Sequence, residues 1–225
     1  MGRFFSAVLL CVVFGGLAGC ATTGSNPKDP YEKFNRTMFS VNEGLDTVAK
    51  PIAQGYNAVV PMPLRVVIGN FFGNLGDVWI SVNNFLQGNI EKGFSDIGRV
   101  LINTTVGFCG IFDFASEMGL EKHSEDFGQT LGKWGVEPGP YFFWPAIGPR
   151  TARDTLGWVV DMRADPLYDM RDVAARNALR GTRMVEGRAR LLQAESVLDA
   201  AAFDKYEYIR DLYLRSREAA IKDED

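Results

Sequence analysis

The 225-residue sequence contains few of the side chains that bind metals or transfer protons, with one histidine and three cysteines. The single histidine, His123, excludes metal sites built from several histidines and catalysis by a histidine pair. Cys11 and Cys20 fall in the N-terminal segment, so Cys109 is the one cysteine of the remaining chain and cannot form a disulfide within it. Cys109, in VGFCGIF, is interpreted as a small buried hydrophobic residue.

The sequence also has no excess of positive charge and no long apolar run beyond Cys20. Its formal net charge is −4 and its pI is about 5.2. Such a chain offers no general attraction for phosphate backbones, which excludes a nucleic-acid-binding role. Without an uninterrupted apolar stretch of about 20 residues, no membrane-spanning helix is predicted. Hydrophobic residues still make up 46% of the chain, enough for one sizeable core.

The first 19 residues have the outline of a signal peptide, with Arg3 followed by an apolar run and then GGLAGC. Residues 17–20, Leu-Ala-Gly-Cys, resemble the lipobox of bacterial lipoproteins, in which the cysteine is acylated and becomes the mature N-terminus. We therefore expect a lipid anchor at Cys20 and a short polar tether over residues 20–28. The alternative is an ordinary secretory signal that contains a cysteine. Ala21, in place of Asp, implies sorting to the outer membrane.

The best-supported helix lies between Asp29 and Pro51. Asp29 is expected to cap it, Pro30 to occupy its first position, and Glu32 to complete a capping box. The apolar residues then recur at the spacing of one helical face: Tyr31, Phe34, Met38, Val41, Leu45 and Val48. We expect Pro51 to end this helix or to begin a new segment.

Residues 64–89 are expected to form two short helices broken around Gly73 to Gly76, and residues 90–108 to continue helically. Their apolar residues are too numerous for one stripe, so these helices need a core or lipid on more than one side. Phe71, Phe72, Trp79 and Phe85 are expected to face lipid or the core. Beyond Arg153 the helices carry one modest apolar face, and that half is expected to face water.

A glycine-rich stretch over residues 106–149 is typical of a hairpin or loop, and it contains four consecutive aromatic residues. These residues are Tyr141, Phe142, Phe143 and Trp144, with Gly139-Pro140 before them and Pro145 after them. One interpretation is a loop folded inward to fill the core. The other is a position at the membrane interface, where the rings lie among acyl chains while the Tyr hydroxyl and the Trp nitrogen remain in contact with water. The lipid anchor and short tether favour the interface.

The sequence carries no convincing catalytic motif. GFSDIG around Ser95 is not a nucleophile elbow, and GQTLGKW lacks the spacing and the Ser/Thr of a phosphate-binding loop. His123 is interpreted as a surface loop residue. The carboxylate clusters show no calcium-loop spacing and are interpreted as a turn and a solvated tail. We therefore predict that the protein is not an enzyme and uses no metal or cofactor.

Five stretches together resemble one family, the MlaA/VacJ outer-membrane lipoproteins. They occur in the family's order from Asp29 to Asp154: DPYEKFNRTMFSVNEGLD, VNNFLQGN, RVLINTTVGFCGIFD, DFGQTLGKWGVEPGPYFFWP and GPRTARD. The region past about Tyr168 matches more weakly. The resemblance implies an all-α, disc- or ring-like arrangement of amphipathic helices with a Gly-rich hairpin, embedded in the inner leaflet of the outer membrane. It would form a single domain over residues 29–225.

The resemblance also implies a function. Family members remove misplaced phospholipids from the outer leaflet, often beside a porin trimer, and pass them to a periplasmic carrier of an MCE-type transport system. The competing hypothesis is a structural lipoprotein that scaffolds a porin or envelope complex. A third hypothesis, a membrane-bound lipid hydrolase, would require His123.

Two sets of candidate site residues follow. The family's Gly-punctuated hairpin beside its pore corresponds to Phe127 to Val136, which makes Gly128, Gly132 and Gly135 gate or hinge candidates. Polar residues that recur inside apolar helices are costly unless they have a role. The candidate channel-lining residues are Asn83, Asn84, Arg99, Asn103, Thr104 and Thr105.

Overall fold

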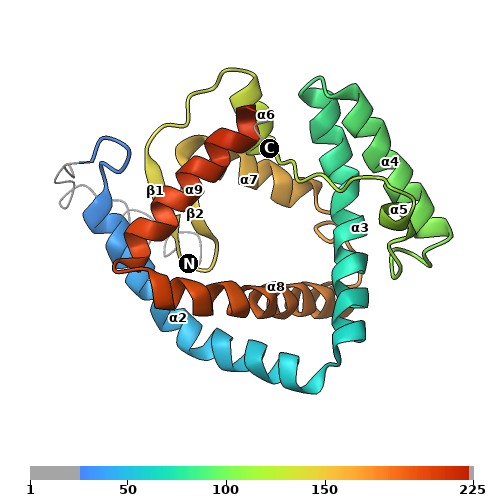
Figure 1. Cartoon of the computed structure of the whole chain (residues 1–225), viewed down its shortest axis with the longest axis horizontal. Coiled ribbons are helices and arrows are strands. Elements are labelled where there is room, and N and C mark those ends of the chain that lie inside the picture. Colours follow the sequence, from blue (N-terminus) through green and yellow to red (C-terminus); the bar gives the residue numbers. More distant parts are fainter. Residues whose placement is uncertain (1–25, 223–225) are drawn as a thin grey trace, which may run out of the picture.

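The computed structural model describes residues 26–222, so the predicted signal peptide and Cys20 lie outside the described residues. Within that range, eight helices and one two-stranded hairpin form a ring (Figure 1). The all-α, ring-like fold class is therefore confirmed. The elements are α2 (Glu32–Val59), α3 (Met62–Leu86), α4 (Ile90–Thr105), α5 (Phe114–Glu117), α6 (Phe127–Lys133), β1 (Tyr141–Trp144), β2 (Gly148–Thr151), α7 (Ala152–Ala164), α8 (Val173–Ala201) and α9 (Lys205–Lys222).

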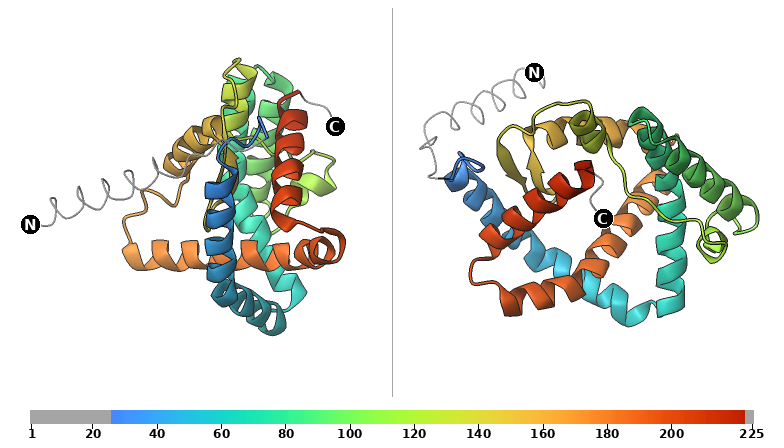
Figure 2. Two further views of the ribbon diagram at one scale, coloured as in Figure 1. Left: turned by 90° about the vertical axis from the view of Figure 1, so that its left-hand side faces the viewer. Right: turned by 45° about the horizontal axis from the view of Figure 1, so that its top comes forward.

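The long helices make the sides of the ring. α2 and α3 meet at a bend of 118°, and α3 pairs with α4. α6, α7 and the hairpin close the ring between the end of α3 and the start of α2 (Figure 1). α8 packs along α2 and extends beyond the layer of the other helices when the ring is seen edge-on (Figure 2). No single helix within residues 26–222 is long and apolar enough to cross a membrane, whereas the bent pair α2–α3 satisfies the length and composition required.

Buried polar contacts join the two ends of the described chain. Asp29 is fully buried and accepts hydrogen bonds from Asn35 Nδ2 at 2.8 Å and from Tyr206 Oη at 2.5 Å. Arg210 Nη1 lies 3.3 Å from the same carboxylate. The prediction that Asp29 caps α2 is therefore wrong, because its carboxylate is used to hold α9 against the start of α2.

Two predicted breaks in the helices are also wrong. α2 continues through Pro51 to Val59, and α3 is a single helix through Gly73 and Gly76. Proline removes one helical hydrogen bond, but the packing of α2 along α8 offsets this loss. In α3 the absence of a side chain at Gly73 gives room to Lys122, whose Nζ would lie 3.2 Å from an added Cβ.

The distribution of polarity is inverted relative to an ordinary soluble domain. Among the described residues, seventeen polar or charged residues are buried, against eight hydrophobic ones. Many large hydrophobic side chains are exposed instead, including Val48 at 65%, Val59 at 80% and Met62 at 69%. Since soluble proteins rarely expose extended apolar surfaces, this exterior is suited to contact with something other than water.

α4 illustrates the inversion at the level of one helix. Ile90, Phe94, Ile97 and Leu101 share one face, and that face points outward, with Phe94 65% and Leu101 59% exposed. The inward face carries Asp96, Arg99 and Asn103, all buried. Gly93 lets α4 approach α3 closely, because a Cβ there would lie 2.7 Å from the ring of Phe85.

The four consecutive aromatic residues form strand β1, whose alternation sends the rings to opposite sides. Tyr141 and Phe143 are buried with Tyr206 in a small core, so their assignment to the membrane interface is wrong. The cause is the antiparallel pairing of β1 with β2, which fixes one side of the strand against α2 and α9. Phe142 stacks on Tyr31 at 5.4 Å between ring centroids, and Trp144 donates to Thr155 Oγ1 at 3.1 Å. For these two residues the interface position remains a prediction.

Candidate functional site

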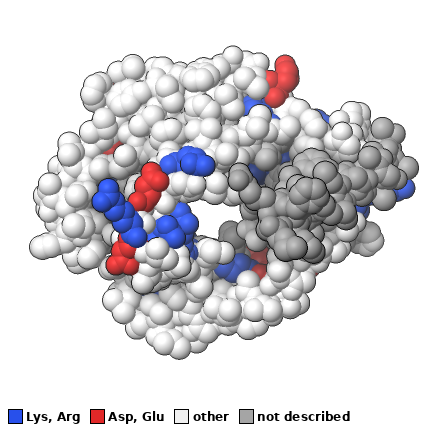
Figure 3. All heavy atoms as spheres, turned by 180° about the vertical axis from the view of Figure 1, so that it is seen from behind, with Lys and Arg blue, Asp and Glu red and all other residues white. Residues whose placement is uncertain are grey.

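The ring surrounds an opening that passes through the molecule in the space-filling view (Figure 3). Charged side chains gather around this opening, whereas the surrounding rim on that face is mostly uncharged (Figure 3). Two cavities adjoin each other through their shared residue Arg183, and we call them the polar cavity and the apolar cavity. Their volumes are about 780 and 740 Å³ respectively.

The polar cavity lies between α3 and α8, with contributions from α2, α4 and the segment that follows α4. Its charged lining residues are Arg65, Asp77, Arg99, Asp113, Lys122, Arg183, Glu186 and Arg190. Five of these are cations and three are carboxylates, so the space favours an anionic or zwitterionic group.

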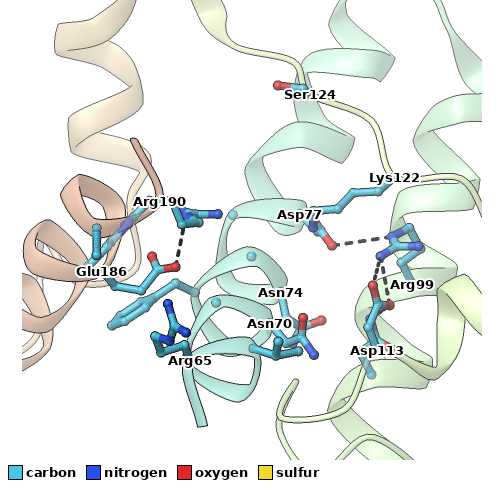
Figure 4. A pocket seen from close by; sticks show the side chains of 18 of the residues that line it. Arg65, Asn70, Asn74, Asp77, Arg99, Asp113, Lys122, Ser124, Glu186 and Arg190 are labelled. Atoms are coloured by element: carbon cyan, nitrogen blue, oxygen red, sulfur yellow. Dashed lines mark hydrogen bonds and ion pairs between the residues drawn. The ribbon is translucent and has the colours of Figure 1, made fainter. Parts of the chain in front are cut away.

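At one end of the polar cavity, the fully buried Arg99 holds the segment after α4 in place (Figure 4). Its Nη2 donates to both carboxylate oxygens of Asp113 at 2.9 Å, and its Nη1 donates to Ser116 Oγ and the Leu120 carbonyl. Asp77 lies 3.6 Å from Arg99 Nε and 2.6 Å from Lys122 Nζ. Burial alone would raise the pKa of Asp113, but hydrogen bonds from Ser116, Asn103 and Arg99 lower it to about 2.

The other end of the polar cavity brings together residues of three helices (Figure 4). Glu186 of α8 is 97% buried and accepts from Arg190 Nε at 2.9 Å through Oε1. Arg65 of α3 donates from Nη1 to Asn57 Oδ1 at 2.7 Å. Tyr56 of α2 completes this end, and its pKa is raised by burial and by the nearby negative charge of Glu186. We call Tyr56, Arg65, Glu186 and Arg190 the α3–α8 cluster.

Sequence reasoning missed the α3–α8 cluster, although a signal for one member exists. Arg65 is the only charged residue between Lys50 and Asp77, and an isolated arginine in an apolar stretch needs a buried partner or a ligand. Glu186 and Arg190 carry no comparable signal, since they lie in a charged helix where such residues are usually solvated.

The apolar cavity lies between α2, α8 and α9 and is lined by large apolar side chains, among them Leu45, Ile52, Met184 and Leu191. An ion-pair network that also lines this cavity fastens α8 to α2. Arg188 donates to Asp46 at 2.6 Å through Nε and Nη2, and Glu195 pairs with both Arg188 and Lys50. The apolar side chains of this cavity are suited to contact with hydrocarbon, whereas its ion-pair network is suited to contact with water.

The six predicted channel-lining residues separate into three groups. Arg99 and Asn103 border the polar cavity. Asn83 and Asn84 are fully buried and do not line either cavity, because Asn83 bonds to Thr130 and Trp79 and Asn84 bonds to Asp96. Thr104 and Thr105 are exposed; Thr105 Oγ1 donates to the Leu101 carbonyl at 2.6 Å, which leaves it on the outer side of α4.

The expected hairpin over Phe127 to Val136 is instead the short helix α6. Asp126 and Gln129 form a capping box at its start. Gly128 and Gly132 are packing positions, since an added Cβ would lie 2.7 Å from Asp154 Oδ1 at Gly128 and 2.7 Å from Ile221 at Gly132. Both glycines are surrounded by neighbouring elements, and their hinge role remains a prediction. Gly135 ends the helix at φ +87° in open space, and its hinge role remains a prediction.

A buried ionic cluster holds α6, α7 and α9 together. Arg217 of α9 donates to Asp126 at 2.7 Å and to Asp154 at 3.0 Å. Asp154 also accepts from Tyr213 Oη at 2.5 Å and from Arg153. Burial opposes ionisation of Asp154, but hydrogen bonds and charge from Arg217 and the Tyr213 hydroxyl lower its pKa well below the ordinary value.

Two further side chains differ from their predicted settings. His123 is 13% exposed, and its Nδ1 lies 2.8 Å from the buried Asp96, so it is not a solvated loop residue. The neighbouring Lys122 binds Asp77, and the two contacts together attach this segment to α3 and α4. Cys109 is exposed and has φ +59°, because it lies on the turn after α4 and not in a core.

A helical ring with a polar interior and an apolar exterior is therefore the class of fold that these residues define. The chain belongs to the MlaA lipoprotein family, whose family model matches residues 27–220. The resemblance found in the sequence is thus confirmed.

Relatives and a solved structure agree with this assignment. The chain is 35% identical to the intermembrane phospholipid transport system lipoprotein MlaA of Escherichia coli (strain K12), over 88% of this chain and 82% of the relative. The protein of the same name from Haemophilus influenzae is 31% identical, over 92% and 86% respectively. A solved structure described as "Structural basis for maintenance of bacterial outer membrane lipid asymmetry" matches with a TM-score of 0.73 and 34% identity, over 86% of this chain and 98% of the solved chain.

Proposed function

We propose that this protein is an outer-membrane lipoprotein that removes misplaced phospholipids from the outer leaflet and hands them to a periplasmic carrier, which maintains lipid asymmetry. The observation that carries the proposal is the inverted polarity of the ring, with buried Arg99, Asp77 and Asn103 inside and exposed Phe94 and Leu101 outside. The names of its relatives support intermembrane phospholipid transport as the process.

The physical problem that such a protein solves is the cost of moving acyl chains through water. Two C16 chains exposed at about 0.8 kcal/mol per methylene would cost on the order of 25 kcal/mol. A ring that keeps the chains in apolar surroundings while the headgroup meets polar groups removes most of this cost. No bond is made or broken in this process, so the protein acts as a transporter and not as an enzyme.

The two cavities divide these tasks. The polar cavity receives the headgroup, because its lining includes five cations and several amides. The apolar cavity accommodates acyl chain, because Leu45, Ile52 and Met184 line it. Arg183 borders both spaces, so the junction of headgroup and chains lies near this residue.

The exposed apolar residues of α2, α3 and α4 support a position of the ring within one leaflet. Four apolar residues that line neither cavity are at least 55% exposed: Val48 and Val59 of α2, Leu64 of α3 and Phe94 of α4. Burial of such side chains in hydrocarbon contributes about 1 kcal/mol or more for each. With acylated Cys20 as the anchor, the ring lies in the periplasmic leaflet of the outer membrane.

Two measurements test this proposal. A strain that lacks the protein is expected to expose phospholipid at the cell surface and to lose its permeability barrier, and the wild-type protein is expected to restore both. The protein purified in mild detergent is expected to retain phospholipid, detected by native mass spectrometry. A normal barrier in the deletion strain together with lipid-free purified protein would refute the proposal.

A structural lipoprotein that scaffolds a porin or envelope complex is the alternative, because the exposed apolar face of α4 also suits a protein partner. Variants inside the polar cavity separate the two functions. Lys122→Gln, which keeps the outer surface intact, is expected to alter lipid asymmetry while co-purification with a porin trimer is retained. Normal asymmetry in this variant, with loss of the porin, would favour the scaffold.

The lipid hydrolase alternative requires His123 as a base. His123→Gln keeps a polar group near Asp96, and we expect it to leave the permeability barrier unchanged. Release of free fatty acid by the wild-type protein, lost in His123→Gln, would instead establish a hydrolase.

A further inference from the structure

The α3–α8 cluster contains three buried polar atoms without a hydrogen-bond partner in the described protein: Tyr56 Oη, Arg65 Nε and Glu186 Oε2. A buried polar group that lacks a partner costs roughly 1–3 kcal/mol. Three such atoms at one end of one cavity are therefore expensive for the empty protein. Their cost is offset if a ligand supplies the missing partners.

The arrangement of charges around these atoms is specific. Figure 4 shows Glu186, Arg190 and Arg65 on one side of the pocket, across from Asp77, Arg99 and Asp113. Glu186 uses Oε1 for Arg190 and keeps Oε2 available. Arg190 is 70% exposed and its guanidinium is directed into the pocket, while Arg65 is fixed by Asn57 at 2.7 Å.

These groups suit a ligand with two opposite charges. The two guanidinium groups and the Tyr56 hydroxyl donate hydrogen bonds, which a phosphodiester accepts. The free carboxylate oxygen of Glu186 accepts from a cation, which a purely anionic headgroup does not offer. A headgroup with an amine on a short linker to its phosphate satisfies both requirements at once.

We propose that Tyr56, Arg65, Glu186 and Arg190 form a headgroup subsite that selects zwitterionic aminoalkyl phospholipids over anionic ones. This inference rests on the proposed function and adds the class of lipid to it. Phosphatidylglycerol presents the same phosphodiester to the arginines, but it offers neutral hydroxyls in place of an ammonium group to Glu186, which is 97% buried. A charge-assisted hydrogen bond from the ammonium group to the carboxylate is stronger than one from a neutral hydroxyl, so discrimination arises mainly at this carboxylate.

Competition between two lipids tests the subsite. The full mature protein in mild detergent is incubated with mixed micelles of phosphatidylethanolamine and phosphatidylglycerol, equimolar and with identical acyl chains, and bound lipid is measured by native mass spectrometry. We expect the wild-type protein to enrich phosphatidylethanolamine roughly tenfold, as one charge-assisted hydrogen bond allows. Glu186→Gln keeps an acceptor for Arg190 and is expected to bring the ratio close to that of the mixture.

Two further variants separate selection from folding and from general binding. Tyr56→Phe removes one donor to phosphate, so it is expected to lower the total bound lipid while the ratio of the two headgroups stays that of the wild type. Glu91→Gln makes the same chemical change at an exposed position of α4 outside both cavities, and it is expected to behave as the wild type.

The failure of this inference is distinct from the failure of the proposed function. Bound phospholipid with no headgroup enrichment, enrichment of phosphatidylglycerol, or unchanged selection in Glu186→Gln would overturn the subsite and leave transport standing. Absence of bound phospholipid of either kind from the wild-type protein would overturn the subsite, and together with a normal permeability barrier in the deletion strain it would overturn the proposed function as well.

Discussion

A single added methyl group at Gly157 is expected to separate two sides of the ring. A Cβ at this position of α7 would lie 2.4 Å from Gly128 N and 2.6 Å from Gly128 Cα. Both atoms belong to the backbone of α6, so no side-chain rotation relieves the clash. The two helices must move apart by about 1 Å to restore ordinary contact.

The cost of this movement has two parts. Overpacking contributes about 1–3 kcal/mol. The shift also weakens the contact of Arg217 with the buried Asp154, and disruption of a buried ion pair typically costs about 3–5 kcal/mol. We therefore expect Gly157→Ala to lower the free energy of unfolding by at least about 3 kcal/mol, equivalent to a fall in Tm of roughly 10 °C.

Thermal unfolding in detergent, followed by far-UV circular dichroism, measures this effect. Gly44→Ala is the matched control, because Gly44 lies in α2 with no atom within 4 Å of an added Cβ. Its higher helix propensity is expected to raise stability by up to about 1 kcal/mol. Equal Tm values for Gly157→Ala and the wild type would refute the close packing of α6 on α7.

Three further predictions follow from the polarity of the ring. Phe94→Lys is expected to lower the affinity for phospholipid vesicles by two orders of magnitude or more, because a charge in hydrocarbon costs about 3 kcal/mol. Vesicle flotation measures this affinity, and Phe94→Leu should bind as the wild type. Asn103→Leu is expected to lower stability by about 3 kcal/mol, because Asp113 and the Ala115 amide both lose their partner, whereas Thr105→Leu should leave both stability and the permeability barrier unchanged. The pKa of Asp113 is lowered to about 2 from 3.8. Its ionised form therefore adds about 2 kcal/mol of stability above pH 4, and this contribution is lost as the pH falls toward 2. Asp113→Asn should flatten that part of the pH–stability curve, and an unchanged acid transition would contradict the assignment.

The sequence predicts the outer surface of the ring better than its interior. The apolar stripes on α2 and α4 are evident from spacing, because period and composition are local properties. The direction in which each stripe faces depends on contacts between helices that are distant in the sequence. The sequence cannot distinguish a stripe that faces a protein core from one that faces outward, since the side chains are the same in both cases.

The breaks that were expected at Pro51 and at Gly73 to Gly76 show the same limit. Proline and glycine weaken a helix by their local chemistry, but packing along the length of the ring outweighs this. Gly128 and Gly132 similarly have the composition of a flexible segment, and only the positions of Asp154 and Ile221 reveal them as contact points between helices.

The site is the part that sequence reasoning recovers least. Arg99 and Asn103 were identified because they are polar residues within an apolar helix, and both border the polar cavity. Glu186 was missed because its burial depends on α8 packing across α3, which brings together residues more than 100 positions apart. Tertiary contacts of this kind leave no periodic signal in the chain.

The most direct test of the inverted ring places nitroxide spin labels on its two sides in membrane-reconstituted protein that carries Cys109→Ala. Labels are attached at Phe94→Cys on the exterior and at Arg190→Cys in the polar cavity, and collision rates with oxygen and with a water-soluble nickel complex are compared. We predict that the label at position 94 meets oxygen preferentially, as in hydrocarbon, and that the label at position 190 meets the nickel complex. The opposite order, or preferential contact with nickel at both positions, would contradict a ring that turns its apolar surface to lipid.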